Sequence, residues 1–355
     1  MRFLHVVGAR PNFMKVAPLM RALAALQGVV QTLVHTGQHY DQNMSGVFFR
    51  ELEIPEPDFN LAVGSGTHAE QTSQIMLRFE PVVLEQKPDW VLVYGDVNST
   101  IAAALVCAKL QIPVAHVEAG LRSFDRSMPE EINRLLTDQL ADLLFTPSRD
   151  GDRNLLQEGL PRERIHFVGN VMIDTLVRLL PKAAAALPAE LPERYALVTL
   201  HRPSNVDDLA GLKSLLDALT CIGIALPIIF PVHPRTRQRI AELGFNHSKN
   251  LRLWEPQSYL QFLALQQKAT VVITDSGGIQ EETTFLGVPC FTLRDSTERP
   301  ITVTVGTNVI IGRDMNLLYR GVKAVLNGER KNSSVPPLWD GGAAERIAHI
   351  LEATG

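Results

Sequence analysis

The sequence predicts an α/β protein with two doubly wound parallel sheets, one in each of two consecutive domains, and a cleft between the domains. Three observations carry this prediction. Short apolar runs rich in valine, isoleucine and leucine alternate with amphipathic stretches along almost the whole chain, as parallel strands alternate with their connecting helices. A compositionally simpler stretch, 174–194, interrupts this alternation near its middle. A length of 355 residues is also enough for two separate cores.

The first domain is expected to span 1–172 and to be Rossmann-like. Its apolar runs are short, β-branched and bounded by turn residues, which is typical of buried strands. The predicted strands are 2–7, 29–35, 90–94, 113–117, 143–146 and 164–168. Between them, apolar residues recur at helical spacing over 14–26, 68–86, 98–110, 130–141 and 150–158.

The second Rossmann-like domain is expected to span 173–341. The stretch 174–194 contains an alanine run that ends at Pro188 and is interpreted as a linker or surface helix. Six further strands follow, at 195–200, 227–232, 250–253, 270–274, 289–293 and 307–311. A last helix at 341–352 is expected to return to the first domain, which would then include 342–355.

Composition narrows the function. A formal net charge of −4 argues against nucleic-acid or membrane-surface partners, because neither would attract this chain. Three isolated cysteines in apolar surroundings indicate a reducing compartment. The chain begins with a strand and no signal peptide is expected, and Lys109, Gln111 and Pro113 interrupt the apolar window 101–117. We expect a cytoplasmic protein that spans no membrane.

The most informative motif is Thr274 to Glu282, which directly follows the apolar run Val271–Ile273. A strand, a small-residue turn and a helix start leave backbone N–H groups pointing at any anion placed there. Gly277 and Gly278 remove the side chains that would block a phosphate. Glu282 lies too far along the helix to meet that phosphate and is expected to accept two ribose hydroxyls. The alternative is a strand-to-helix turn with Ser276 as its N-cap and no ligand.

Other polar residues follow the predicted strands of the first domain. Arg10 and Lys15 come after the first strand, near a helix start, where the helix dipole disfavours positive charge. Either they bind a shared anion, or they are two solvated surface cations. Asp96 could be a catalytic group or a helix cap. Glu118 leaves a buried strand into a glycine turn, has no capping role, and is therefore the best catalytic candidate.

Glu130 and His201 have two interpretations each. Ser127, Pro129 and Glu130 match a helix start with a capping box, which favours a structural role for Glu130. His201 ends a strand of the second domain, where a ligand-binding role and an ordinary surface role are both open.

Several familiar sites are not predicted. The segment Gly64 to Ala69 fits a loose dinucleotide fingerprint but lies far from the first strand-turn-helix unit. No convincing phosphate-binding P-loop, metal-ligand spacing or Ser-His-Asp order is present, so neither a metal nor a redox cofactor is expected.

Taken together, the motifs resemble those of the non-hydrolysing UDP-N-acetylglucosamine 2-epimerases over nearly the whole chain. The matching pieces are Gly8 to Lys15, Thr36 to His39, Gly95-Asp96, His116 to Arg122, Pro129 to Arg134, His201-Arg202, Pro231 to Pro234, Asp275 to Glu282 and Arg294 to Pro300. The resemblance implies a fold like that of the B-type glycosyltransferases, a homodimer, no cofactor, and conversion of UDP-GlcNAc to UDP-ManNAc for cell-surface polysaccharides.

The resemblance also implies residue roles. The positions that match the family's active-site residues are Arg10, Lys15, Asp96, Glu118, Glu130 and His201. Those that match its nucleotide-binding residues are Ser276, Gly277, Gly278, Glu282 and Arg299, with Gln257 and Phe262 on the uracil side. For Glu130, this implied role takes precedence over the capping interpretation.

The chain departs from the family pattern at a few positions. Ala9 and Asn12 replace the usual threonine and glutamate, and Ile301 replaces a glutamate. Bacterial members can bind a second, activating UDP-GlcNAc near a Gln-His-Arg segment. Here that segment reads Gln38-His39-Tyr40-Asp41, which leaves the activating site open.

The chemistry of the implied reaction suits these residue types. Expelling UDP from carbon 1 makes the proton on carbon 2 removable and gives 2-acetamidoglucal, and cations with a helix terminus can stabilise the departing diphosphate. Because the proton leaves one face of the ring and another arrives on the opposite face, at least two acid–base groups are expected. The hypothesis assigns proton transfer to Glu118 and Asp96 and stabilisation of the cationic centre to Glu130. Alternatives are a hydrolysing epimerase that releases ManNAc and UDP, a glycosyltransferase, or a catalytically silent UDP-sugar sensor.

Overall fold

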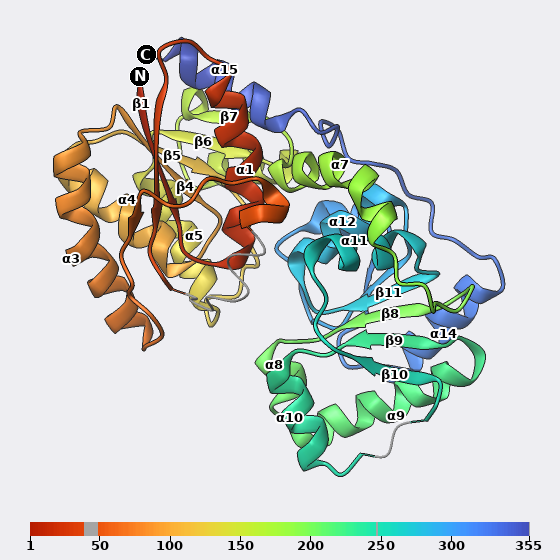
Figure 1. Cartoon of the computed structure of the whole chain (residues 1–355). Coiled ribbons are helices and arrows are strands. Elements are labelled where there is room, and N and C mark those ends of the chain that lie inside the picture. The colour runs from red at the N-terminus through yellow and green to blue at the C-terminus, as the bar shows by residue number, and fades with distance from the viewer. Residues whose placement is uncertain (39–48, 246–247, 355) are drawn as a thin grey trace. The chain divides into compact units, whose positions relative to one another are not determined.

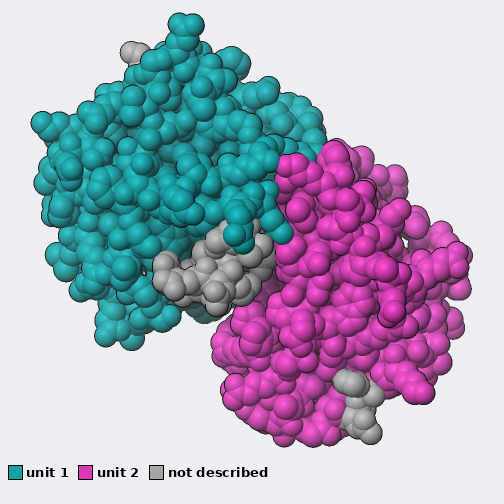
Figure 2. Space-filling model, viewed as in Figure 1, with its two compact units in different colours: residues 1–178, 337–355 teal, residues 179–336 magenta. Residues whose placement is uncertain are grey.

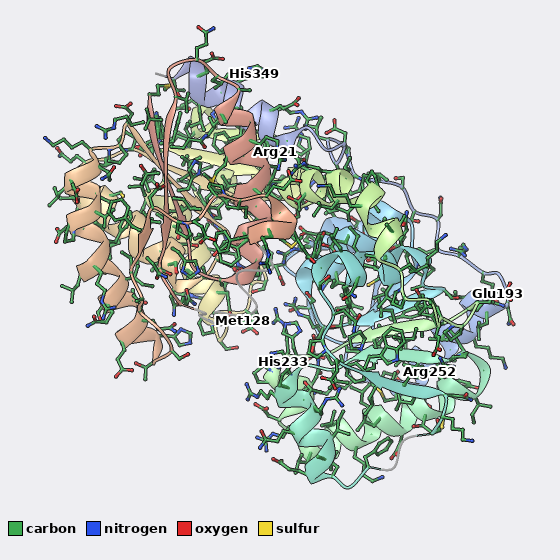
Figure 3. All side chains as sticks on the ribbon, viewed as in Figure 1. Arg21, Met128, Glu193, His233, Arg252 and His349 are labelled. Carbon is green, nitrogen blue, oxygen red and sulfur yellow. The ribbon has the colours of Figure 1, made fainter. Side chains whose placement is uncertain are left out.

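A computed structural model describes residues 1–38, 49–245 and 248–354 of the chain. It divides into two compact units, shown in different colours in Figure 2: unit 1 comprises 1–178 with 337–355, and unit 2 comprises 179–336. Each unit contains one parallel sheet and the helices that cover it, and Figure 1 labels many of these elements. In each unit, side chains fill the space between the sheet and its helices (Figure 3).

The sheet of unit 1 has seven strands in the order β3-β2-β1-β4-β5-β6-β7. Every neighbouring pair is parallel. The strands are β1 Arg2–Val7, β2 Val30–His35, β3 Phe59–Asn60, β4 Trp90–Tyr94, β5 Val114–Val117, β6 Leu143–Thr146 and β7 Ile165–Phe167. Leu4, Val91 and Val114, which are paired across β1, β4 and β5 and therefore share one face of the sheet, belong to its hydrophobic core. The strand order reverses direction between β1 and β4, the place where doubly wound sheets bind ligands.

The helices of unit 1 connect successive strands and return at the C-terminus. They are α1 Arg10–Ala24, α3 His68–Gln86, α4 Asn98–Leu110, α5 Pro129–Leu140, α6 Arg149–Gln157, the 3-10 helix η1 Arg162–Arg164, α7 Val171–Ala183 and α15 Ala343–Ala353. The residues of α7 from 179 onward belong to unit 2. Asp174 of α7 accepts hydrogen bonds from the backbone N–H groups of Ala343 and Ala344 (3.2 and 2.6 Å), and α15 packs against α1. The carboxylate of Asp174 thus caps the C-terminal helix on unit 1.

The sheet of unit 2 has six parallel strands in the order β10-β9-β8-β11-β12-β13. The strands are β8 Ala196–Thr199, β9 Ile228–Pro231, β10 Leu251–Trp254, β11 Val271–Thr274, β12 Cys290–Thr292 and β13 Asn308–Ile310. The remaining elements are η2 Ala184–Ala186, α8 Pro203–Val206, α9 Leu209–Ala225, α10 Pro234–Glu242, α11 Tyr259–Lys268, α12 Gly277–Leu286, α13 Pro300–Thr304 and α14 Met315–Leu326.

The predicted fold class is confirmed, and a few element predictions need correction. The edge strand β3 was not predicted, because two residues are too short to show a periodic pattern. Helix α1 begins at Arg10 rather than at 14, since proline is tolerated in the first turn of a helix. The start of the predicted linker is part of α7, a helix with fully buried Ile173 and Leu176. Among the described residues, no helix has the length and apolar character that a bilayer crossing requires.

Candidate functional site: the carboxylates of unit 1 and the helix terminus of unit 2

Lys15 and Glu118 form a buried ion pair in unit 1. The ammonium group of Lys15 donates a hydrogen bond to Oε2 of Glu118, and the two side chains are only 5% and 4% exposed. Lys15 is the sixth residue of α1 and lies in its second turn. The helix dipole disfavours cations only in the first turn, so it disfavours the charge of Arg10 and not that of Lys15. The side chain of Arg10 lies outside what the structure describes. The site residues Lys15 and Glu118 are therefore in direct contact.

The backbone around this pair is strained. Glu118 has a φ of 77°, the left-handed region that residues with a Cβ rarely adopt. Such a conformation costs roughly 1–3 kcal/mol and persists where the surroundings impose it. A glycine at position 95, with a φ of 62°, makes room for the pair, because a Cβ there would lie 2.6 Å from the Lys15 nitrogen.

Asp96 follows strand β4 and is not a helix cap. The N-cap of α4 is Val97, which has no side-chain capping bond, so the capping interpretation of Asp96 is wrong. The carboxylate of Asp96 is 27% exposed and lies 3.2 Å from Nε of Arg134, while its carbonyl accepts a hydrogen bond from Asn133 (2.8 Å). Asp96 is thus oriented by α5 and remains accessible to a ligand.

The capping box predicted at the start of α5 is not formed. Met128, labelled in Figure 3, is the N-cap, and Ser127 instead donates its hydroxyl to Asp125 at 2.6 Å. Glu130 is the second residue of the helix and half-buried. The capping interpretation of Glu130 is therefore wrong, because the helix starts one residue later than the motif suggested.

Glu131 carries the structural role in its place. Its carboxylate is buried and accepts hydrogen bonds from the backbone N–H groups of Ser123 and Phe124 (3.0 and 2.9 Å) and from Arg134 (2.8 Å). A chain of contacts therefore connects Asp96, Arg134, Glu131 and the loop after Glu118. The sequence reasoning missed Glu131 because two adjacent glutamates follow the same proline and only their positions in the helix distinguish them.

A pocket of about 380 Å³ in unit 1 contains two of the candidate carboxylates. Asp96 and Glu130 line it together with the side-chain amides of Gln71, Asn98 and Asn133. The segment Gly64 to Ala69 also contributes to the lining, but its Thr67 is the N-cap of α3, with a capping box to Glu70. This pocket offers carboxylates and amides, the groups that bind hydroxyl and acetamido substituents.

Asp275 organises the equivalent edge of the sheet in unit 2. It is fully buried after β11 and accepts hydrogen bonds from the backbone N–H groups of His201 and Arg202 and from the side chain of Asn205. Nδ1 of His201 lies 3.0 Å from its Oδ1. Burial alone would raise the pKa of Asp275, but the interactions with His201, Asn205 and the backbone outweigh it and lower the pKa below its ordinary value.

His201 is half-exposed, and Asp275 fixes the orientation of its ring. The sequence analysis gave no role to Asp275. Its position, directly after a buried strand and before a glycine turn, is the same feature that identified Glu118 as a candidate.

Helix α12 begins at Gly277 with Ser276 as its N-cap, and the Ser276 side chain makes no capping bond. The guanidinium of Arg299 lies over this terminus: a Cβ at position 277 would be 2.4 Å from its Nη1. Arg299 is held there by Glu281, 2.9 Å from its Nε, and by Glu298. The carboxylates of Glu281 and Glu298 offset the repulsion between this cation and the positive end of the helix. The terminus thus presents backbone N–H groups and a guanidinium, and a phosphate site here stays a prediction beside the alternative of a turn without a ligand.

Glu282 lies beside the segment expected to bind a nucleobase. The hydroxyl of Tyr259, at the start of α11, donates to Oε1 of Glu282 at 2.9 Å. Phe262 of α11 is partly buried against the core beneath it, and Gln257 donates to the carbonyl of Glu255 (2.8 Å). The candidate residues of unit 2 thus gather around α11 and α12. Tyr259 and Glu281 are additions that the sequence did not suggest.

Among the described residues, no group of three or more histidine, cysteine, aspartate or glutamate side chains could hold a metal ion. The possible activating segment includes His39, Tyr40 and Asp41, which lie outside the described residues.

Comparison with known proteins gives concordant matches. The family model described as UDP-N-acetylglucosamine 2-epimerase matches residues 21–352. The UDP-N-acetylglucosamine 2-epimerase of Methanocaldococcus jannaschii is 43% identical over 99% of both chains. A UDP-2,3-diacetamido-2,3-dideoxy-D-glucuronate 2-epimerase of Pseudomonas aeruginosa is 42% identical over 99% of both chains.

Solved structures show the same relationship. The crystal structure of the Methanocaldococcus jannaschii UDP-GlcNAc 2-epimerase in complex with UDP-GlcNAc and UDP has a TM-score of 0.90 and 41% identity, and covers 99% of this chain and 100% of that one. A glycosyltransferase of kitacinnamycin shares the fold alone, with a TM-score of 0.61 at 15% identity.

Proposed function

The chain belongs to the UDP-N-acetylglucosamine 2-epimerase family, and on that premise we propose that it interconverts UDP-GlcNAc and UDP-ManNAc without hydrolysing them. UDP leaves carbon 1 and a proton leaves carbon 2, which gives 2-acetamidoglucal. UDP then adds back to carbon 1 while a proton is delivered to the opposite face of carbon 2, and this addition inverts the configuration. The observation that carries this proposal is a set of three carboxylates in unit 1. Glu118 follows β5 and is paired with Lys15, while Asp96, which follows β4, and Glu130, at the start of α5, line one pocket.

In this proposal, the leaving diphosphate is stabilised mainly by unit 2. The N–H groups at the start of α12 and the guanidinium of Arg299 meet the phosphates, and His201, oriented by Asp275, adds a further donor. Arg10 and Lys15 of unit 1 contribute positive charge. Glu282 accepts the ribose hydroxyls, while Gln257 and Phe262 contact the uracil.

Proton transfer at carbon 2 is assigned to unit 1. Glu118 and Asp96 form the proton-transfer pair, because inversion requires groups on opposite faces of the ring. Glu130 stabilises the positive charge that develops as UDP departs. No redox cofactor takes part, since the hydrogen on carbon 2 leaves as a proton. A cytoplasmic location, without nucleic-acid or membrane partners, belongs to the same proposal.

The test is incubation of the protein with UDP-GlcNAc alone in deuterated water, followed by NMR and chromatography. The proposal expects UDP-ManNAc that carries deuterium at carbon 2. Unlabelled UDP-ManNAc would exclude exchange of that proton with solvent. Free ManNAc accumulating at the rate of turnover would favour the hydrolysing reaction instead.

One observation favours a second candidate substrate. A relative named as a UDP-2,3-diacetamido-2,3-dideoxy-D-glucuronate 2-epimerase is almost as similar to this chain as the UDP-GlcNAc 2-epimerase. The same elimination is possible on that sugar, which carries an additional acetamido group and a carboxylate. Comparing kcat/KM for the two UDP-sugars decides between them, and a higher value for the diacetamido sugar would replace UDP-GlcNAc as the proposed substrate.

We also propose a homodimer. Leu77 and Leu84 lie seven residues apart on α3, and their side chains are 65% and 54% exposed. Residues at this spacing share one face of a helix, so the two leucines form an apolar stripe that a second copy of the chain could cover.

A further inference from the structure

A buried polar centre in unit 1 connects the turns that carry Asp96 and Glu118. At this centre is Asp138 of α5, whose side chain is fully buried. Its Oδ1 lies 2.6 Å from Nδ1 of His116, and its Oδ2 accepts a hydrogen bond from the backbone N–H of Gly120 (3.1 Å). Arg122 also contacts Oδ2, at 2.7 Å.

The other nitrogen of His116 extends this contact to the next strand. Nε2 lies 2.8 Å from the carbonyl oxygen of Gly95. A carbonyl oxygen only accepts hydrogen bonds, so Nε2 is the donor. Gly95 directly precedes Asp96, and Gly120 is two residues after Glu118. One carboxylate therefore reaches both turns, one of them directly and the other through the His116 ring.

The turn after β5 has a backbone conformation that needs such support. Gly95, Glu118 and Gly120 all have positive φ values, of 62°, 77° and 80°. Glycine adopts such values readily, but Glu118 has a Cβ, and a residue in a sparsely populated conformation persists only where the surrounding structure imposes it. The contacts of Asp138 with His116 and Arg122 are short (2.6 and 2.7 Å), and hydrogen bonds that involve charged groups are stronger than neutral ones. Burial would raise the pKa of Asp138, but His116 and Arg122 outweigh it and lower the pKa, which keeps the acceptor ionised.

We propose that Asp138 and His116 are positioning residues that fix the separation of the Asp96 and Glu118 carboxylates for proton transfer at carbon 2. This inference rests on the proposed function. Neither residue faces the pocket that Asp96 and Glu130 line. Their effect is therefore on the geometry of groups that do touch the substrate. A displacement of about 1 Å in such groups can lower a rate by about 100-fold.

The test compares Asp138→Asn with Asp174→Asn. Asp174 is a matched control because it is also a buried carboxylate of unit 1 that accepts two backbone hydrogen bonds, yet it lies at the start of α15. For Asp138→Asn, kcat is expected to fall by about 100-fold, while KM and the affinity for UDP change by less than about twofold. For Asp174→Asn, kcat is expected to stay within about twofold of wild type.

A kinetic isotope effect separates positioning from loss of folded protein. With substrate deuterated at carbon 2, the isotope effect on kcat is expected to be larger for Asp138→Asn than for wild type, because misplaced carboxylates slow proton removal. A smaller fraction of folded enzyme would lower kcat without changing the isotope effect. If Asp138→Asn does not fold, His116→Gln serves instead: the amide retains a donor for Gly95 and loses the bond to Asp138, so a smaller loss of kcat with the same rise in isotope effect is expected.

Three outcomes overturn the inference. Asp138→Asn, or His116→Gln in its place, could match Asp174→Asn in kcat. Alternatively, kcat could fall with an unchanged isotope effect. These two outcomes concern only the variants, and the proposed function stands as long as the wild-type protein epimerises the UDP-sugar. A wild-type protein that neither epimerises UDP-sugars nor exchanges the proton on carbon 2 removes the proposed function, and the inference with it.

Discussion

Glu118 combines burial, a positive φ and an ion pair with Lys15 in one residue. None of these properties serves helix capping or solubility, and each has an energetic cost that the remaining structure must offset. Strain of this kind is typical of residues whose position matters for chemistry. The single residue thus carries the argument that unit 1 performs proton transfer.

Replacing Glu118 with glutamine tests that argument. We expect turnover to fall by about 10²–10⁴-fold, the usual contribution of a general acid or base. The affinity for UDP should remain close to that of wild type, because the nucleotide contacts are proposed in unit 2. Turnover assays and calorimetric titration with UDP measure both quantities. Asp142→Asn, which alters an exposed carboxylate at the other end of β5, is the control, and equal activity in the two variants would refute a catalytic Glu118.

Asp174 provides a prediction about stability and pH. Burial raises the pKa of its carboxyl from 3.8 to about 6, although the N–H groups of Ala343 and Ala344 oppose the shift. The folded protein therefore binds this proton more tightly than the unfolded chain does, and the group stabilises the fold at low pH. Its contribution is lost as the pH rises toward and through about 6.

We expect the free energy of unfolding of wild type, relative to Asp174→Asn, to fall by about 1 kcal/mol between about pH 5 and about pH 7. Urea unfolding of both proteins at each pH measures the difference. Taking the difference between the two proteins removes the contributions of other carboxylates. If the free energy of unfolding of wild type instead rises relative to that of Asp174→Asn as the pH rises, the pKa of Asp174 is lowered in the folded protein.

At the level of elements, the sequence predicted the strands well and some helix starts poorly. A parallel strand that is buried on both faces is a continuous apolar run, so it can be predicted from its own residues without knowing which strands pair with it. Helix starts depend on competing local bonds: Asn12 accepts the N–H groups of Gly8 and Ala9, so α1 begins before the motif suggested. The capping box at Ser127 failed for the same reason, since Asp125 accepts the Ser127 hydroxyl.

The terminus of α12 depends on Gly277 in a way that a single substitution can test. A methyl group at this position would lie 2.4 Å from Arg299 and 2.8 Å from Glu298. In Gly277→Ala, we expect Arg299 to be displaced and the affinity for UDP to fall by about tenfold or more, the effect of losing about 1.4 kcal/mol of binding. The control is Gly223→Ala. Gly223 lies in α9 of the same unit, and the added methyl group would be 3.4 Å from its nearest neighbour, so this variant should bind UDP like wild type. Unchanged affinity in Gly277→Ala would place the phosphates elsewhere.

At the level of the whole molecule, the two-unit α/β architecture was predictable because each sheet repeats one pattern of strand and helix. The polar contacts that organise the site were not. Asp275 and Asp138 bind residues of other elements that are distant in sequence, and Glu131 binds the backbone of the irregular loop before its own helix. Local sequence patterns reveal neither kind of contact. Asp96, Glu118 and His201 were predicted from strand ends, where the topology of parallel sheets places ligands. Gln257, Phe262 and Arg299 were predicted only from the resemblance to the family.

The proposed dimer gives a prediction at this scale. Replacing Leu77 and Leu84 together with glutamate places two charges on the exposed stripe of α3 and should convert the dimer to a monomer, because burying unpaired charges is costly. Sedimentation velocity measures the change. Leu156→Glu, on α6 and 38% exposed, should leave the dimer intact. A double variant that sediments like wild type would exclude this face.

Reversible departure of UDP is the central claim, and supplying the two fragments tests it most directly. The protein is incubated with UDP and 2-acetamidoglucal, and the products are separated by chromatography. The account predicts that both UDP-GlcNAc and UDP-ManNAc form and approach the ratio reached from UDP-GlcNAc alone. If no UDP-sugar forms, although the same preparation interconverts the two UDP-sugars, inversion at carbon 2 does not proceed through the glycal.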